Sequence, residues 1–381
     1  MGVTEITAKS VLRKMKRIDS WFLTFYGMNL YRGCTHNCSY CDGRAEKYYV
    51  EGEFGCDVGV KTNAIEILRR ELDPARKRVP LKSCFMMLGG GVGDSYQPVE
   101  EKYLLARQVL ELFDQHHMPV HILTKSTLVE RDLDLVLRIH QKRRAMVSMS
   151  FSTVDDELAA WLEPGVPLPS VRLRTLAAFK DQGIVCGMFL MPVIPGITDT
   201  PEQIERSVKA AAETGLDFIH FSGLTLKEGR QRKHFESVLK VHRPDVLPGY
   251  RKIYRGQQWG NAVGAYYTRL GKRFYDIARQ YKTPVRVPAT VYNDILDEKS
   301  RIVVMLDQMD HICQLKGEKS PYGYAAWAIS QLEGPVGPHR EKLELLKGMN
   351  TQTAAVVRDM LETGTSPVYK SLLALEEKGN A

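Results

Sequence analysis

Three of the seven cysteines lie within eight residues, at Cys34, Cys38 and Cys41, in the segment YRGCTHNCSYC. Their spacing is C-x3-C-x2-C, and three thiolates on one short loop can each bind a different iron of a [4Fe–4S] cluster. The fourth iron then has no protein ligand and can bind the amino and carboxylate groups of S-adenosylmethionine (SAM). An electron passed into the SAM sulfonium would release a 5′-deoxyadenosyl radical, so the cofactors would carry the difficult chemistry.

Two other kinds of site fit part of this pattern. A tetrahedral zinc site needs a fourth ligand, and His36 could supply it, although it lies between two of the cysteines. A redox-active pair formed by Cys38 and Cys41 would leave Cys34 without a role. The spacing favours the cluster. The other four cysteines, at positions 56, 84, 186 and 313, are scattered, and the odd total argues against a disulfide framework.

Strand-length apolar segments alternate with helical patterns between residues 22 and 222. This alternation predicts an α/β fold with a parallel sheet and crossover helices. Six strands are fewer than the eight of a closed TIM barrel, so we expect a partial (β/α)6 barrel. The expected strands are 22–30, 83–88, 120–123, 146–151, 185–193 and 218–221, and the expected helices are 62–72, 99–113, 132–139, 170–180 and 202–213.

Polar and glycine-rich residues follow several of these strands, at the edge where such barrels bind their ligands. The cysteines follow the first strand, and Thr124 and Lys125 follow the third. The second strand is followed by three glycines, Gly89, Gly90 and Gly91.

The alternation stops after residue 222, which suggests three regions. We expect the barrel and its cysteine loop in 1–222 and an α+β extension that closes the barrel in 223–300. A mostly helical C-terminal region is expected in 301–381. Within the extension, the patterns predict helices at 230–242 and 264–280 and a short strand at 285–287.

The chain of 381 residues carries a net charge of +8, counting histidine as neutral. A basic excess favours a polyanionic partner such as nucleic acid, although many enzymes are mildly basic without one. No apolar segment approaches the roughly 20 residues needed to span a bilayer. Residues 1–17 lack the apolar core of a secretory signal. We therefore expect a cytoplasmic protein without a membrane anchor.

The cysteine loop resembles that of the radical SAM superfamily. Residues 25–230 resemble the branch that contains spore photoproduct lyase and its uncharacterised relatives. The resemblance implies a radical SAM barrel around a [4Fe–4S] cluster and SAM, supplied with electrons by a donor such as flavodoxin or ferredoxin. The motifs that carry it are Asn29-Leu-Tyr-Arg-Gly-Cys34, Gly93-Asp-Ser-Tyr-Gln-Pro98, Thr124-Lys-Ser126 followed by Arg131-Asp132, and Leu162-Glu-Pro164 followed by Arg172.

The resemblance also implies contacts with SAM. Gly89–Gly91 would let the backbone approach the methionine amino group, because glycine has no side chain in the way. Asp94 would accept hydrogen bonds from that ammonium, and Lys125 would pair with the carboxylate. Ser150, or Ser148 on the same face of the strand, would bind the carboxylate or the ribose.

Two departures set this chain apart from lyases that split the thymine lesion of spore DNA. In those lyases a cysteine before the loop that follows the second strand returns a hydrogen atom to the product radical, whereas here Gly91 takes its place. Cys56 is the candidate hydrogen donor instead, since Cys84 looks buried within a strand. The second departure is Asp42, which follows the last cysteine where the lyases usually have an aromatic residue. We expect SAM cleavage with a lyase-like reaction on DNA; the alternative is modification of a peptide, RNA or small molecule.

The C-terminal region is less informative. The segment Leu346–Ala354 weakly resembles a helix-hairpin-helix loop, which binds a DNA phosphate through backbone N–H groups. In that interpretation Asn350 would adopt a left-handed conformation. The alternative is a turn in a helical cap packed on the barrel.

Overall fold

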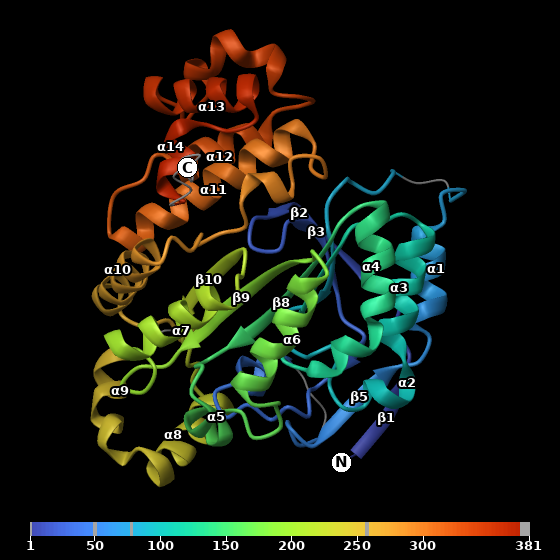
Figure 1. Cartoon of the computed structure of the whole chain (residues 1–381), viewed down its shortest axis with the longest axis vertical. Coiled ribbons are helices and arrows are strands. Elements are labelled where there is room, and N and C mark those ends of the chain that lie inside the picture. The colour runs from blue at the N-terminus through green and yellow to red at the C-terminus, as the bar shows by residue number, and fades with distance from the viewer. Residues whose placement is uncertain (1, 49–51, 77–78, 256–258, 374–381) are drawn as a thin grey trace.

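The computed structural model describes residues 2–48, 52–76, 79–255 and 259–373. At its centre is a parallel sheet of five strands in the order β10-β9-β8-β7-β6 (Figure 1). All four pairings in this sheet are parallel, as the alternation predicted. The strands are β6 (Met86–Gly89), β7 (Val120–Thr124), β8 (Ala145–Phe151), β9 (Val185–Val193) and β10 (Phe218–Gly223).

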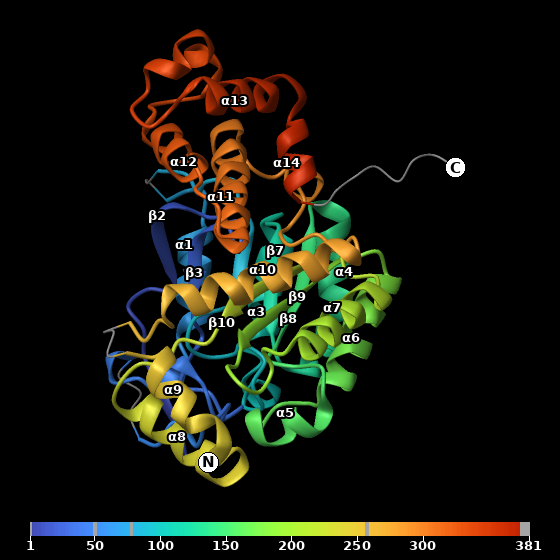
Figure 2. The same ribbon diagram turned by 90° about the vertical axis from the view of Figure 1, so that its left-hand side faces the viewer.

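Helices cover one face of this sheet and leave the other face to line the inside of a partial barrel (Figures 1 and 2). Phe221 of β10 points to the helical face, where it stacks on Phe274 with ring centroids 4.5 Å apart. Its neighbour His220 therefore points to the inner face, because successive residues of a strand face opposite sides. The covering helices are α3 (Leu105–Gln115), α4 (Leu133–Lys142), α6 (Pro169–Asp181), α7 (Pro201–Glu213) and α10 (Gly264–Gln280).

The N-terminal strands depart from the six-strand expectation. The expected strand 22–30 forms β3, which pairs antiparallel with β2 instead of joining the parallel ladder. One hydrogen bond, from the Phe85 N–H to the Leu23 oxygen (3.0 Å), ties it to the start of β6. A third sheet has the order β1-β5-β4. These strands are β1 (Gly2–Ile6), β2 (Leu12–Asp19), β3 (Thr24–Met28), β4 (Tyr31–Arg32) and β5 (Asp57–Lys61).

Two further expectations need correction. The expected helix 99–113 is broken at Leu104, whose left-handed φ of 54° separates α2 (Glu100–Tyr103) from α3. The expected strand 285–287 is irregular, although the Pro284 oxygen accepts a hydrogen bond from Ile219 of β10 (2.8 Å). The remaining barrel elements are α1 (Ala64–Leu72), α5 (Asp156–Leu162) and the 3-10 helices η1 (Asp42–Arg44), η2 (Glu46–Tyr48) and η3 (Thr127–Asp132).

The C-terminal helices lie at two ends of the barrel (Figures 1 and 2). Helices α8 and α9 lie near the carboxyl ends of the strands, and α11 to α14 gather at the opposite end. One apolar core continues from the sheet into α10 and α11. The division of the chain into three regions, with boundaries at 222 and 300, stays a prediction. The elements are α8 (Arg230–His242), η4 (Pro244–Val246), α9 (Leu247–Ile253), η5 (Ala289–Val291), α11 (Glu298–Lys316), α12 (Tyr322–Gln331), η6 (Gly337–Leu345), α13 (Thr351–Thr363) and α14 (Pro367–Leu372).

The loop before α13 differs from the helix-hairpin-helix expectation. Asn350 is extended, with a φ of −134°, and caps α13 by accepting a hydrogen bond from the Thr353 N–H. The left-handed residue in this loop is Gly348 instead, with a φ of 94°. Within the described part of the chain, no helix combines the length and the apolar character needed to cross a membrane.

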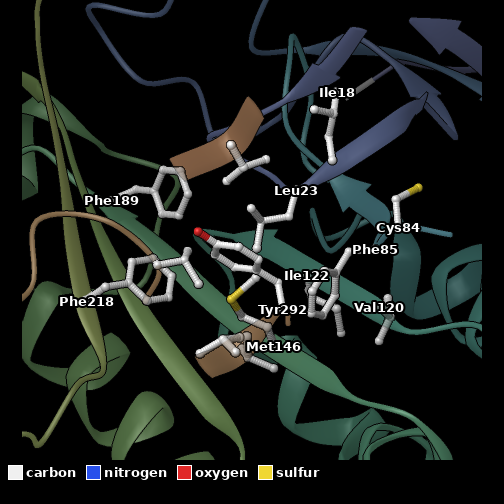
Figure 3. Packing of buried hydrophobic residues seen from close by; sticks show 14 of the residues in the cluster. Ile18, Leu23, Cys84, Phe85, Val120, Ile122, Met146, Phe189, Phe218 and Tyr292 are labelled. Carbon is white, nitrogen blue, oxygen red and sulfur yellow. The ribbon is translucent and has the colours of Figure 1, made fainter. Parts of the chain in front are cut away.

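Apolar side chains pack on the inner face of the barrel from the amino ends of the strands to about their middle. Figure 3 shows Phe189 and Phe218 extending from neighbouring strands towards Tyr292. The two phenylalanine rings meet edge to face, with centroids 6.2 Å apart. Towards the carboxyl ends of the strands, the lining changes to polar and glycine residues, and the cysteine loop lies there.

Candidate active site

The three cysteines of the loop between β4 and η1 are largely buried together. Cys34 and Cys38 are 8% and 5% exposed. Burial raises the pKa of all three thiols, to about 12 for Cys38, and charge on Cys38 or Cys41 would raise that of Cys34 further. A bound metal would offset this cost by replacing the three protons.

The arrangement fits a cluster better than a zinc ion. Among the described residues, no three Cys, His, Asp or Glu side chains are placed to hold one metal ion. A cubane does not require that placement, because each thiolate binds a different iron. The expected zinc alternative also needs a free nitrogen on His36. Its Nδ1 lies 3.0 Å from the Gly165 oxygen and its Nε2 lies 3.1 Å from an Asp94 oxygen, so both are engaged.

Residues that follow β10 in the sequence hold the cysteine loop in place. The Gln231 side chain donates a hydrogen bond to the Tyr40 backbone oxygen (2.9 Å). Asp42 accepts hydrogen bonds from the Lys227 ammonium and from the Tyr48 hydroxyl, the latter at 2.6 Å. The residue that departs from the lyase pattern is therefore an anchor that ties the loop to the segment before α8.

Glu163 is the centre of a buried charge network beside the loop. One carboxylate oxygen accepts hydrogen bonds from Lys125 (2.8 Å), Ser152 (2.8 Å) and the Tyr40 hydroxyl. The other accepts one from Arg172 (2.6 Å), whose side chain is fully buried. Burial alone would raise the pKa of Glu163, but the charges of Arg172 and Lys125 outweigh it and hold that pKa well below its usual range. The motif around Glu163 carried the family resemblance, but its partners are distant in the chain and this network was not predicted.

Asp94 is fully engaged with the protein. One oxygen accepts hydrogen bonds from the Tyr96 N–H (2.8 Å) and the Thr124 hydroxyl (2.7 Å). The other accepts the Lys125 N–H (2.7 Å) and faces Nε2 of His36. A carboxylate has about four acceptor positions, and these four donors fill them. A bond to the SAM ammonium would have to displace one of them, so the geometry supports a positioning role that joins the cysteine loop to the end of β7.

The other expected SAM contacts lie at two depths in the barrel. Lys125 reaches across the strand ends, where its ammonium donates a hydrogen bond to the Ser150 backbone oxygen (3.1 Å). Ser148 lies two residues deeper on the same face of β8. It is fully buried, and its hydroxyl lies 2.9 Å from Nε2 of His121. The structure brings Lys125 and Ser150 together and places Ser148 in a separate contact.

The glycines at the end of β6 and in the loop after it have two different roles. At Gly89, where φ is 111°, a side chain would overlap the backbone oxygen of Leu123 on the neighbouring strand. At Gly91, where φ is 72°, nothing lies within 4 Å of the position that a Cβ would occupy. Gly89 is therefore required by the sheet, whereas Gly91, beyond Gly90, leaves open space that a ligand can approach.

We expect Gly89→Ala and Gly91→Ala to differ strongly in their effect on stability. Gly89→Ala should lower the free energy of unfolding by about 4 kcal/mol, because it combines a left-handed alanine with a backbone overlap. Gly91→Ala should cost only about 1 kcal/mol, from the backbone conformation alone. Urea denaturation of both variants measures the difference, and equal losses would contradict the close approach at Gly89.

The candidate hydrogen donor Cys56 lies beside the cysteine loop, since its neighbour Gly55 packs against Asn37, whereas Cys84 lies at the other end of the sheet. Cys56 is exposed just before β5, on the segment that also includes Phe54, whose oxygen accepts a hydrogen bond from Arg44 of η1 (3.4 Å). Cys84 is buried before β6, at the opposite end of the sheet, where its sulfur accepts a hydrogen bond from the Phe25 N–H (3.5 Å). The donor role of Cys56 stays a prediction.

Comparison with known proteins gives relatives for most of the chain. The family model described as the radical SAM superfamily matches residues 28–202. The uncharacterized protein Rv2578c of Mycobacterium tuberculosis is 33% identical over 261 residues, which are 67% of this chain and 74% of that protein. The uncharacterized protein MJ0683 of Methanocaldococcus jannaschii is 30% identical over 211 residues, or 55% and 74% of the two chains.

Among solved structures, spore photoproduct lyase complexed with dinucleoside spore photoproduct superposes with a TM-score of 0.54. The match covers 73% of this chain and 79% of the lyase at 14% identity. A mutant of that lyase with bound AdoMet and dinucleoside spore photoproduct also gives a TM-score of 0.54. At such identities the likeness concerns the fold. The matched family model and the 33% identical relative show that this chain belongs to the radical SAM superfamily, and its fold is similar to that of spore photoproduct lyase.

Proposed function

We propose that this protein is an enzyme that cleaves SAM reductively at a [4Fe–4S] cluster held by Cys34, Cys38 and Cys41. The observation that carries the proposal is a loop at the carboxyl ends of the barrel strands on which Cys34 and Cys38 are buried and Cys41 is partly buried, with both nitrogens of His36 engaged elsewhere. When bound, the cluster and SAM would supply a 5′-deoxyadenosyl radical.

The residues of the chain then have binding and positioning roles. Lys125 would pair with the SAM carboxylate, because its ammonium lies at the strand ends and its largely buried side chain keeps 13% of its surface exposed there. The open space at Gly91 would accept the methionine amino group. Ser150, at the end of β8 on the inner face, would bind the carboxylate or the ribose. Asp94 and Glu163 would hold the cysteine loop and Lys125 in register through the contacts described above.

For the substrate we propose nucleic acid, with a carbon–carbon lyase reaction on a damaged base. The fold shared with spore photoproduct lyase and the net charge of +8 support this choice. Electrons would come from a small carrier such as flavodoxin or ferredoxin.

A second candidate is a radical SAM enzyme that modifies a peptide, RNA or small molecule. It is favoured by one observation, the absence of a thiol where the lyases carry their hydrogen donor. Gly91 takes that position, Cys84 lies at the opposite end of the sheet, and Cys56 lies on a different segment, just before β5.

The test is an assay of SAM cleavage and of lesion repair in one reaction. The protein is reconstituted anaerobically with iron and sulfide, reduced, and mixed with SAM, with and without an oligonucleotide that carries the 5-thyminyl-dihydrothymine lesion. Both 5′-deoxyadenosine and restored thymine are quantified. Restored thymine would establish the lyase reaction, and 5′-deoxyadenosine without repair would favour the second candidate. Protein that binds about one zinc and no iron would overturn both.

A further inference from the structure

The inner face of the barrel carries polar side chains well below the strand ends. His121 of β7 and Ser148 of β8 contact each other there, and His220 lies in the middle of β10. His220 is three residues before the end of its strand, which corresponds to a depth of about 10 Å. Polar residues therefore continue from the expected SAM site into the barrel.

Beside His220 lies an arginine whose donors are unused. Arg286 is 1% exposed, and its Nε, Nη1 and Nη2 have no hydrogen-bond partner among the described residues. Its guanidinium lies over the ring of Trp21, 3.8 Å from the ring centroid. Stacking of this kind fixes the plane of the guanidinium but uses none of its N–H groups.

His220 is unpartnered as well. It is fully buried, and neither of its ring nitrogens has a hydrogen-bond partner in the described parts of the chain. Trp21 meets both His220 and His311 edge-on, with ring centroids 5.4 Å and 5.3 Å apart, and so joins them to Arg286. Unused donors from β10 and from the segment after α10 thus gather around one tryptophan.

The nearby carboxylates do not pair with this arginine. Asp19 accepts hydrogen bonds from the backbone N–H groups of Trp21 (2.8 Å) and Phe22 (3.2 Å). Asp307 forms its ion pair with Arg17. A buried guanidinium without a hydrogen-bonded partner is strongly unfavourable, so a fold that keeps one has a use for its free donors.

The net positive charge of this group of side chains would also favour binding of a single anion. Burial lowers the pKa of Arg286 to about 9, which leaves it positively charged at neutral pH. Burial also lowers the pKa values of His220 and His311 well below the usual range, so both are neutral there.

We infer that Arg286 and His220 form a binding subsite for an oxyanion, a carboxylate or a phosphate, that belongs to the substrate. This inference rests on the proposed function, because it assumes that the substrate enters the barrel below SAM. The planar guanidinium can bind both oxygens of such a group, and the imidazole can donate a third hydrogen bond. The substrate is held by its anionic group about 10 Å below the strand ends, with its reacting carbon nearer the cluster.

The subsite is tested by anion-dependent stability of the reconstituted full chain, which requires no turnover. Inorganic phosphate and acetate are titrated separately against chloride at constant ionic strength, and the melting temperature is recorded. We expect a saturable rise of about 5 °C when the better anion exceeds its Kd about 100-fold. The stronger of the two probes identifies the group as phosphate or carboxylate.

Three variants decide the location of the effect. Arg286→Met should abolish the rise, whereas Arg279→Met, an exposed residue of α10 that gives the same net charge, should preserve it. If Arg286→Met does not fold, His220→Phe serves instead. It keeps the aromatic shape and should weaken anion binding about tenfold through loss of one hydrogen bond. No saturable rise in the unaltered chain would overturn the subsite, and an equal rise in Arg286→Met would indicate an adventitious ion only. SAM cleavage is measured separately, so a failed subsite and a failed proposed function can be told apart.

Discussion

Cys38→Ala is expected to eliminate the iron–sulfur absorbance of the reconstituted protein and to reduce SAM cleavage to background. Cys38 is the central cysteine of the loop, and its thiol is 5% exposed. Without it, only Cys34 and Cys41 remain to hold a cubane that needs three protein thiolates to leave one iron open. Among the other described cysteines, Cys84, Cys186 and Cys313 are buried in other parts of the fold, and the exposed Cys56 lies outside the C-x3-C-x2-C loop.

The measurement combines iron and sulfide analysis, visible absorbance and quantification of 5′-deoxyadenosine under reducing conditions. Cys313→Ala is the matched control, because it removes a buried thiol from α11 at the other end of the barrel. The control should keep its cluster and its SAM cleavage. Full activity in Cys38→Ala would refute the cluster assignment.

Glu163→Gln is expected to lower the free energy of unfolding by about 3–5 kcal/mol. The carboxylate is buried, and its substitution leaves the fully buried Arg172 and the largely buried Lys125 without a counter-charge. Glu213→Gln on α7 is the control, because its carboxylate forms an exposed pair with Lys209 and should contribute little. Urea denaturation at pH 7 gives both values, and similar losses would contradict the network.

The same variant should change the dependence of stability on pH. Arg172 and Lys125 hold the pKa of Glu163 below its ordinary value in the folded protein, despite the opposing effect of burial. A carboxylate of this kind contributes its full stability above the unfolded pKa of about 4.3, and the contribution is lost as pH falls towards the folded pKa. The unaltered protein should therefore lose more stability than Glu163→Gln between pH 5 and pH 3. Parallel pH profiles would contradict this assignment.

The regular part of the fold could be predicted because its pattern is local. The helix at 264–280 and the strand at 185–193 have the expected limits, since apolar residues recur at helical spacing in the first and run almost without interruption through the second. Strand β2 was missed because most of its residues are charged or exposed, so that it carries no apolar alternation. The strand expected at 22–30 has the right apolar character, but its partner is β2, and pairing is not encoded in the segment itself.

The site divides in the same way. Spacing alone singled out the three cysteines, because the proposed ligands of the cluster lie on one loop. The contact between His36 and Asp94 spans 58 residues, and that between Tyr40 and Glu163 spans 123. Only the folded chain brings such pairs together. Arg286 lies in a segment expected to be a strand, where nothing in the sequence distinguished it from a solvated charge.

The anchoring of the cysteine loop has a consequence for how the protein is made. Lys227 is separated from Asp42 by 185 residues of chain, and Gln231 is separated from Tyr40 by 191. At synthesis rates of about 5–20 residues per second, the cysteines leave the ribosome about 10 s or more before these two anchors exist. During that interval the nascent loop has none of its contacts with the segment that precedes α8. Insertion of the proposed cluster into a fully supported loop would therefore be a late step, after more than half of the chain has been translated.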